Sequence, residues 1–176
     1  IALKVVGVGS VGTQCMILLL EGRDHKDPLF LQIKQANRSV LEEYLTRSPY
    51  KNQGQRVVEG QRLMQTVSDI FLGWNKGDET GINYYWRQLR DWKGSVDVDS
   101  LNTRDLTYLA RLCGWTLAQA HARSGDPVAI SAYLGSSESF DEALVDFAES
   151  YADQNEKDYE AFMHQIRSGQ LAAVEG

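Results

Sequence analysis

The segment KVVGVGSVGTQC, from Lys4 to Cys15, decides the fold, because it contains the pattern G-x-G-x-x-G at Gly7, Gly9 and Gly12. Two unrelated nucleotide-binding architectures use this spacing. In one, the glycines open a helix whose N-terminus holds a pyrophosphate. In the other, they form a bend between two antiparallel strands and cover the phosphates of ATP. In a third interpretation they form a turn and bind nothing.

The residues that follow the glycines favour strands. A dinucleotide-binding helix should continue for at least about ten amphipathic residues, yet only residues 13–21 separate Gly12 from the next glycine, without a helical stripe. After the polar turn EGRDHKDP, the segment LFLQIKQA alternates, with Gln32 and Lys34 on one face and Leu31 and Ile33 on the other. This pattern predicts a strand, a glycine bend, a strand, a turn and a strand.

Further along the chain, the hydrophobic period changes from two residues to 3.6 near residue 95. We therefore predict an α+β fold, with an antiparallel sheet of about five strands and one helix in residues 1–95 and a helical portion in residues 96–176. The helix of the first part is expected at 53–66 and its last two strands at 69–74 and 82–90. In the second part, Leu106, Leu109, Ala110, Cys113, Leu117 and Ala120 form a core-facing stripe, and two more helices are expected around 140–151 and 159–166.

Composition limits the classes of partner. The 176 residues include 18 basic and 24 acidic side chains, and the net charge of −6 argues against a general nucleic-acid binder. Cys15 and Cys113 belong to no metal-binding motif, so no metal site is expected. The longest apolar run, residues 16–20, is too short to cross a membrane. We expect a cytoplasmic protein without a nucleic-acid or membrane partner and, since it begins with Ile1, a piece of a longer chain.

Two charged residues extend the glycine pattern into a candidate nucleotide site. Lys34 lies on the third expected strand, from which an ammonium could reach phosphate oxygens, and Glu59 on the next helix could hold it in place. This order of glycine bend, strand lysine and helix glutamate is that of the small lobe of protein kinases. The alternatives stay open, because a lysine on a strand can simply discourage edge pairing and a glutamate on a helix can simply be solvated.

Other charged residues have no assigned role. Arg87, Arg90 and Lys93 could meet a phosphate or an acidic partner, or form surface salt bridges. In the segment HARSGD, His121 and Asp126 superficially match a kinase catalytic loop, but the asparagine that should follow the aspartate is absent. A structural role is therefore favoured for His121 and Asp126.

Several segments together resemble a bacterial family called domain of unknown function 2252, over nearly the whole chain. They are KVVGVGSVGT, PLFLQIKQA, GQRVVEGQRLMQTVSDIFLGW, RQLRDWKGS, LCGWTLAQAHARSGD and YADQNEKDY. That family is itself similar to the protein-kinase-like superfamily, which includes aminoglycoside phosphotransferases. The resemblance implies a kinase-like small lobe followed by large-lobe helices. It also implies a longer, circularly permuted chain whose catalytic loop and metal-binding aspartate precede the glycine bend.

The resemblance also implies roles for individual residues. The expected cofactors are ATP and magnesium, with the magnesium ligands outside this chain. The expected function is the nucleotide-binding part of a kinase-like, ATP-dependent phosphotransferase with an unknown phosphate acceptor, catalytically incomplete in this chain. The alternative is a pseudokinase-like binding module without enzymatic activity, and the absent helix disfavours a nucleotide-cofactor oxidoreductase. The expected cofactor-binding residues are Gly7, Gly9, Ser10, Gly12 and Lys34, and the expected catalytic residues are Lys34 and Glu59.

Overall fold

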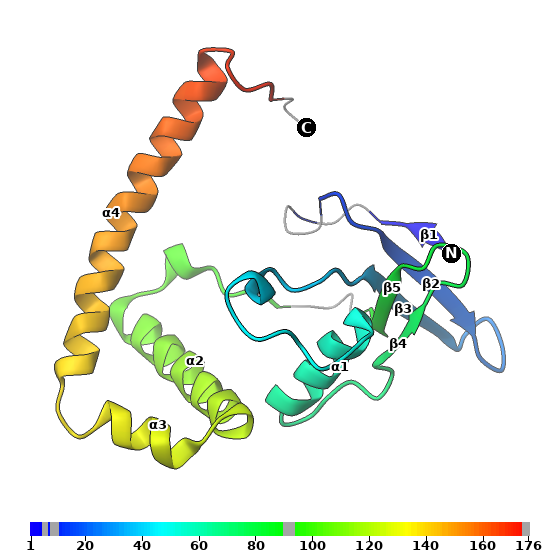
Figure 1. Cartoon of the computed structure of the whole chain (residues 1–176), viewed down its shortest axis with the longest axis horizontal. Helices are drawn as coiled ribbons and strands as arrows, with labels where there is room; N and C mark the ends of the chain where they lie inside the picture. The colour runs from blue at the N-terminus through cyan, green and yellow to red at the C-terminus, as the bar shows by residue number, and fades with distance from the viewer. Residues whose placement is uncertain (5–6, 8–10, 90–93, 174–176) are drawn as a thin grey trace. The chain divides into compact units, whose positions relative to one another are not determined.

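The computed structural model describes residues 1–4, 7, 11–89 and 94–173. The chain divides into two compact units, Ile1–Asp126 and Pro127–Gly176 (Figure 1). The division falls at the end of a long helix, whereas the change from strands to helices lies earlier, near residue 95. The first unit therefore holds the sheet and two α-helices, and the second unit is helical.

Within the described residues of the first unit, five strands form one antiparallel sheet (Figure 1). The prediction of an α+β fold with about five antiparallel strands is confirmed. The spatial order is β1-β2-β3-β5-β4, so the chain leaves the sheet after β3 and returns at its far edge. The strands are β1 (Ala2–Leu3), β2 (Cys15–Glu21), β3 (Pro28–Gln35), β4 (Gly73–Lys76) and β5 (Asn83–Gln88).

The β2–β3 hairpin excludes one interpretation of the glycine pattern. β2 begins at Cys15, which pairs with Lys34, and the hairpin closes where Glu21 pairs with Pro28. Because a strand rather than a helix follows Gly12, the dinucleotide-binding interpretation is wrong. The glycine segment instead lies between β1 and β2, which pair antiparallel.

The helix α1 (Gln53–Met64) contacts β4 and β5 and provides much of the small core. The Asn52 side chain accepts a hydrogen bond of 3.0 Å from the Gln55 N–H, which caps the helix. Gly54 lies so close to β5 that an added Cβ would be 2.1 Å from the Tyr84 carbonyl oxygen. Val58 is completely buried, and the other buried apolar residues in the described part of the chain are Cys15, Leu31, Ala36, Leu72 and Tyr84.

A hydrogen-bonded carboxylate organises the connection between β3 and α1, which includes the 3₁₀ helix Val40–Glu43. Glu42 accepts bonds of 2.9 Å from Arg38 Nε and 3.3 Å from the Ser48 N–H. Desolvation acts to raise the pKa of Glu42, but these two hydrogen bonds and the charges of Arg38 and Arg56 outweigh it and lower the pKa. The ionised form of Glu42 is therefore the one that holds the connection together.

The helix α2 (Thr103–Ser124), which follows a 3₁₀ turn at Val98–Ser100, contacts α1 but has no buried residue. The sequence correctly predicts a helix here, but its apolar stripe is not core-facing within the described chain. Leu106, Cys113 and Leu117, for example, are all exposed. Periodicity identifies an apolar side of a helix, but it does not identify what covers that side.

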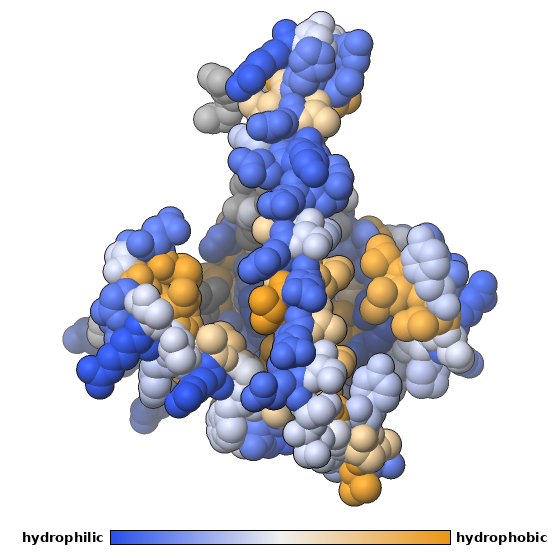
Figure 2. Space-filling model, turned by 90° about the vertical axis from the view of Figure 1, so that its left-hand side faces the viewer, coloured by the Kyte–Doolittle hydropathy of each residue, from blue (hydrophilic) through white to orange (hydrophobic). Residues whose placement is uncertain are grey.

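The second unit contains α3 (Pro127–Leu134) and α4 (Ser139–Arg167). One continuous α4 replaces the two helices expected around 140–151 and 159–166, because the polar residues between them include no glycine or proline to end a helix. Figure 2 shows α4 along its length, with polar residues predominating and apolar side chains at the edges of the polar stripe. In the described part of the chain, no helix has the length and apolar character needed to span a membrane.

Two glycines of α1 provide a test of its packing. We expect Gly54→Ala to lower the free energy of unfolding by about 1–3 kcal/mol, because the new methyl group overlaps the Tyr84 carbonyl. Gly60→Ala is the matched control: its Cβ meets open space, and the loss of backbone freedom in the unfolded chain should raise the free energy by about 0.4–1 kcal/mol. Urea denaturation measures both, and equal effects of the two substitutions would contradict this account of the contact.

The lowered pKa of Glu42 predicts a pH dependence. The stabilising contribution of Glu42 is complete above the ordinary pKa of a glutamate in the unfolded chain and is lost as the pH falls through the lower folded pKa. The difference in unfolding free energy between the wild type and Glu42→Gln should therefore shrink on acidification, as urea denaturation at a series of pH values can measure. Glu43→Gln is the control, because Glu43 is exposed and makes none of these bonds; a constant difference for Glu42→Gln would refute the assignment.

Candidate functional site

One face of the sheet carries Lys34, and we call it the Lys34 face. Lys34 on β3 pairs with Cys15 on β2 and with Tyr85 on β5, and Tyr85 pairs with Trp74 on β4. Side chains of directly paired residues point to the same side of a sheet. The Arg62 guanidinium of α1 lies 5.6 Å from the centre of the Trp74 ring, so α1 packs on this face. The fold thus brings the helix that carries Glu59 to the same side of the sheet as Lys34.

The two predicted catalytic residues do not form an ion pair. Lys34 is half-buried, and within the described residues its ammonium has neither an ion pair nor a hydrogen-bond partner. Glu59 Oε1 instead lies 3.2 Å from Nη1 of Arg62, one turn further along α1. Among the described residues, Lys34 is therefore a cation without a counter-ion and Glu59 a carboxylate with a different partner, and the proposed roles of both residues stay predictions.

Arg62 is the residue of this face that the sequence analysis did not single out. Its Nη2 also donates a hydrogen bond of 3.0 Å to the Leu72 carbonyl oxygen, just before β4. Together with the Trp74 ring, this bond fixes the guanidinium whether or not Glu59 is ionised. The three-residue spacing of Glu59 and Arg62 on a helix was the available signal, since side chains at that spacing are neighbours.

Polar side chains lie beside Lys34. Gln32, two residues before Lys34, is only 6% exposed; its Nε2 donates to Cys15 Sγ at 3.6 Å, and its Oε1 accepts from Arg87 Nη2 at 3.4 Å. Burial raises the pKa of the Tyr85 hydroxyl, against the opposing charge of Arg87 and with a smaller contribution from Cys15. The Lys34 face therefore keeps Tyr85 as a neutral hydrogen-bond donor.

A small cavity of about 210 Å³ lies between this face and the end of α1. Its polar lining residues are four glutamines, one arginine and one aspartate. Asp69 is held in the lining, because its Oδ2 accepts a bond of 2.6 Å from the Gln88 N–H. The lining residues are Gln32, Gln61, Gln65, Val67, Asp69, Arg87 and Gln88.

The glycine segment is described only in part. Gly7 is exposed, with open space where a Cβ would lie. Gly12 has φ of 78°, in the left-handed region that residues with a Cβ rarely adopt, so glycine is required there. Gly9 and Ser10 lie outside the described residues, and binding of phosphates by this segment stays a prediction.

The remaining charged candidates lie in different elements or outside the described residues. Arg87 lies on the Lys34 face, whereas Arg90 and Lys93 lie outside the described residues. His121 belongs to the last turn of α2, where its carbonyl oxygen accepts a hydrogen bond of 2.8 Å from the Gly125 N–H, and Asp126 follows the end of the helix. In the described ranges, no three His, Cys, Asp or Glu side chains come together in a way that could hold a metal ion.

Comparisons with known proteins give one match. A family model described as an uncharacterized protein conserved in bacteria (DUF2252) matches residues 1–165. No curated protein and no solved structure matches the chain significantly. The match covers the whole first unit and most of the second, and its description assigns no activity to the family.

The two contacts of Arg62 differ in strength, and this difference is testable. We expect Arg62→Met to lower the free energy of unfolding by about 2–3 kcal/mol, because it removes a charged hydrogen bond to a part-buried carbonyl and the contact with Trp74. Glu59→Gln removes only a solvent-exposed ion pair and should cost less than about 1 kcal/mol. Urea denaturation of both variants measures the two values, and a larger effect of Glu59→Gln would show that the ion pair is what anchors Arg62.

Proposed function

Since the chain belongs to the bacterial family called domain of unknown function 2252, we propose that its first unit is the nucleotide-binding part of a kinase-like, ATP-dependent phosphotransferase. The phosphate acceptor is unassigned. In this proposal the sheet and α1 form a kinase-like small lobe. The catalytic loop and the magnesium ligands belong to other parts of a longer, circularly permuted chain.

One observation carries the proposal: Lys34, whose ammonium has no partner among the described residues, lies on a central strand, on the face that α1 covers, and its strand pairs with β2, which follows the glycine segment. The order of elements supports it, because β1, the glycines, β2, β3 with Lys34, α1 with Glu59, β4 and β5 follow each other as in a kinase small lobe. The half-buried ammonium of Lys34 suits the binding of phosphate oxygens, since it has no counter-ion to give up in the part of the chain that the structure describes.

Glu59 would orient Lys34 only after a change of partner. The carboxylate is now held by Arg62 at 3.2 Å, with exposed fractions of 41% for the Arg62 side chain and 29% for that of Glu59. An ion pair so open to water contributes at most about 1 kcal/mol. Bound phosphates next to Lys34 could offset this cost, while Arg62 keeps its bond to the Leu72 carbonyl.

The chain's own residues would bind and orient the nucleotide and would not transfer phosphate. A magnesium ion, when bound, would bridge the phosphates and neutralise their charge. The described residues do not supply a cluster of ligands for such an ion, so no step through magnesium is assigned to them. Lys34 would contribute a point charge toward the phosphates, and the glycine segment would contribute backbone N–H donors.

A second candidate function is a binding module that keeps the lobe but does not catalyse transfer. It is favoured by the Arg62–Glu59 pair, which leaves Lys34 without the carboxylate that a kinase lysine uses. Hydrolysis of ATP by the full-length parent protein would favour the phosphotransferase, and nucleotide binding without turnover would favour the binding module.

The proposal predicts how affinity depends on Lys34. The chain should bind ATP with a dissociation constant of the order of 0.1–1 mM, because a site open on one side buries little of its ligand. Lys34→Gln should weaken ATP binding about tenfold, or about 1.4 kcal/mol, and leave adenosine binding unchanged, because it removes only the partner of the phosphates.

Calorimetry with ATP and with adenosine measures these affinities. Lys157→Gln in α4 is the matched control, because it removes the same charge from an exposed position in the second unit. A chain that does not bind ATP, or an equal loss of affinity in both variants, would refute the nucleotide assignment of Lys34.

A further inference from the structure

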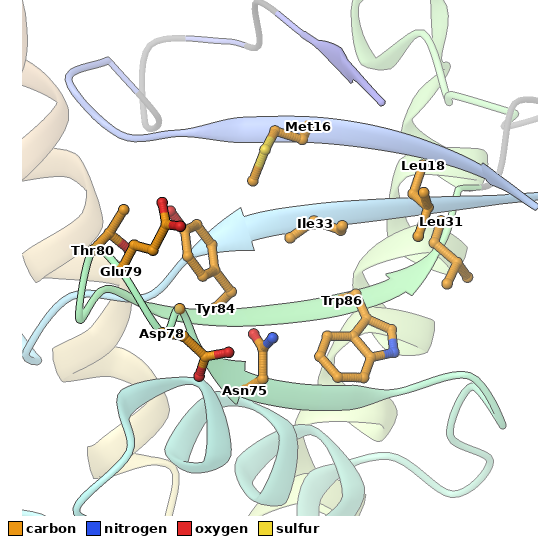
Figure 3. A pocket seen from close by; sticks show the side chains of 11 residues that line it. Met16, Leu18, Leu31, Ile33, Asn75, Asp78, Glu79, Thr80, Tyr84 and Trp86 are labelled. Atoms are coloured by element: carbon orange, nitrogen blue, oxygen red, sulfur yellow. The ribbon is translucent and has the colours of Figure 1, made fainter.

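The other face of the sheet holds a larger open groove, of about 690 Å³, that is independent of the proposed nucleotide site. Strand alternation separates the two faces, because Ile33 lies next to Lys34 and points to the opposite side. Residues of β2, β3, β4 and β5 and of the β4–β5 turn line this groove (Figure 3). They are Met16, Leu18, Leu31, Ile33, Asn75, Gly77, Asp78, Glu79, Thr80, Tyr84 and Trp86.

The floor of the groove is apolar and fixed by the register of the sheet. Met16, Ile33 and Trp86 form one row across three strands. The Trp86 indole ring lies over Gly73 of β4, where an added Cβ would be 2.4 Å from the ring, so the glycine lets the ring lie flat at the sheet edge. Leu18 and Leu31 form the next row. Rows on one face are about 7 Å apart, two residues along a strand.

The two ends of the groove differ in chemistry. Leu18 and Leu31 lie at one end, and Asp78, Glu79 and Thr80 of the β4–β5 turn lie at the other (Figure 3). Asp78 and Glu79 are exposed, and within the described chain neither has an ion-pair partner. Between the ends, the Tyr84 ring is held by a hydrogen bond from its hydroxyl to Gln14 Oε1. The groove is therefore apolar along its length and negative at one end.

We propose that this groove binds an organic cation: an amine carried on an aliphatic or aromatic body, with the ammonium at Asp78 and Glu79. An apolar body gains by covering the floor, and only a positive head group gains at the carboxylates. The floor extends about 13 Å, two row spacings, from the Tyr84 row to the Leu18 row, which sets the length of the body. The volume lies within the range of small-molecule sites, about 300–1,000 Å³. The net charge of −6 also favours a cation.

Three eight-carbon compounds with different head groups test the proposal on the full chain. We expect n-octylammonium to bind about tenfold more tightly than octanoate, with 1-octanol between them, because two exposed carboxylates each add a small attraction. Calorimetry gives the affinities. Nuclear magnetic resonance of the Trp86 indole N–H, identified with Trp86→Phe, shows whether the ligand occupies the groove.

Asp78→Asn combined with Glu79→Gln should reduce the preference for octylammonium over octanoate to about twofold or less. The exposed turn should tolerate both changes. Asp153→Asn combined with Glu156→Gln, which removes the same charge from exposed positions of α4, should leave the preference unchanged.

Four results would overturn the proposal: equal binding of octanoate, an unchanged preference in the turn variant, an equal loss in the α4 variant, or binding that does not shift the Trp86 signal. Sedimentation velocity can give a fifth result that would overturn the proposal. A dimer that Ile33→Asp dissociates, without binding of octylammonium, would assign the groove to a second copy of the chain.

Discussion

β3 pairs with β2 along one edge and with β5 along the other, and both faces of the sheet depend on this double pairing. The register that puts Lys34 between Cys15 and Tyr85 also puts Ile33 between Met16 and Trp86. A slip of one residue would exchange the faces, moving a lysine into the apolar groove and an isoleucine under α1. One set of hydrogen bonds thus fixes both the candidate nucleotide site and the groove on the opposite side.

On the Lys34 face, the relative strengths of the contacts that Arg62 makes decide which side chain can change its partner. Arg62 is held by a carbonyl oxygen and an aromatic ring, whereas its ion pair with Glu59 is exposed to water. The weaker contact can be given up without moving α1, which Gly54 and Val58 hold against the sheet. Glu59 is thus the adjustable group of this face, and Arg62 is a fixed one.

Much of the apolar surface of the helices is not covered within the described chain. α2 and α4 have no buried residue, although both carry large apolar side chains such as Trp115 and Phe162. Ring contacts such as the stacked pair Phe147 and Tyr151, with centroids 5.7 Å apart, cover only a small part of it. The stability of the first unit therefore rests on the sheet and α1, where the buried residues are found.

The sequence by itself determined the elements that local patterns specify. Alternation in LFLQIKQA predicted β3 and the faces of Lys34 and Ile33, and helical periodicity located α1 and α2. The short segment between Gly12 and the next glycine, residues 13–21, predicted a strand there instead of a helix. These features follow from the preferences of neighbouring residues, which a linear sequence contains.

Only the tertiary structure decided which residues meet across the fold. It paired Glu59 with Arg62 rather than Lys34, because an arginine one turn away on the same helix is closer than a lysine on a strand. It left the apolar stripe of α2 exposed, because the hydrophobic periodicity of a helix does not specify which element covers its apolar side. It also assembled the groove from residues 16–86, whose apolar and acidic members become neighbours only through strand order and register. The contacts of the groove depend on long-range strand pairing, and no local pattern in the sequence encodes that pairing; the Glu59–Arg62 pair, in contrast, is a local contact within one helix.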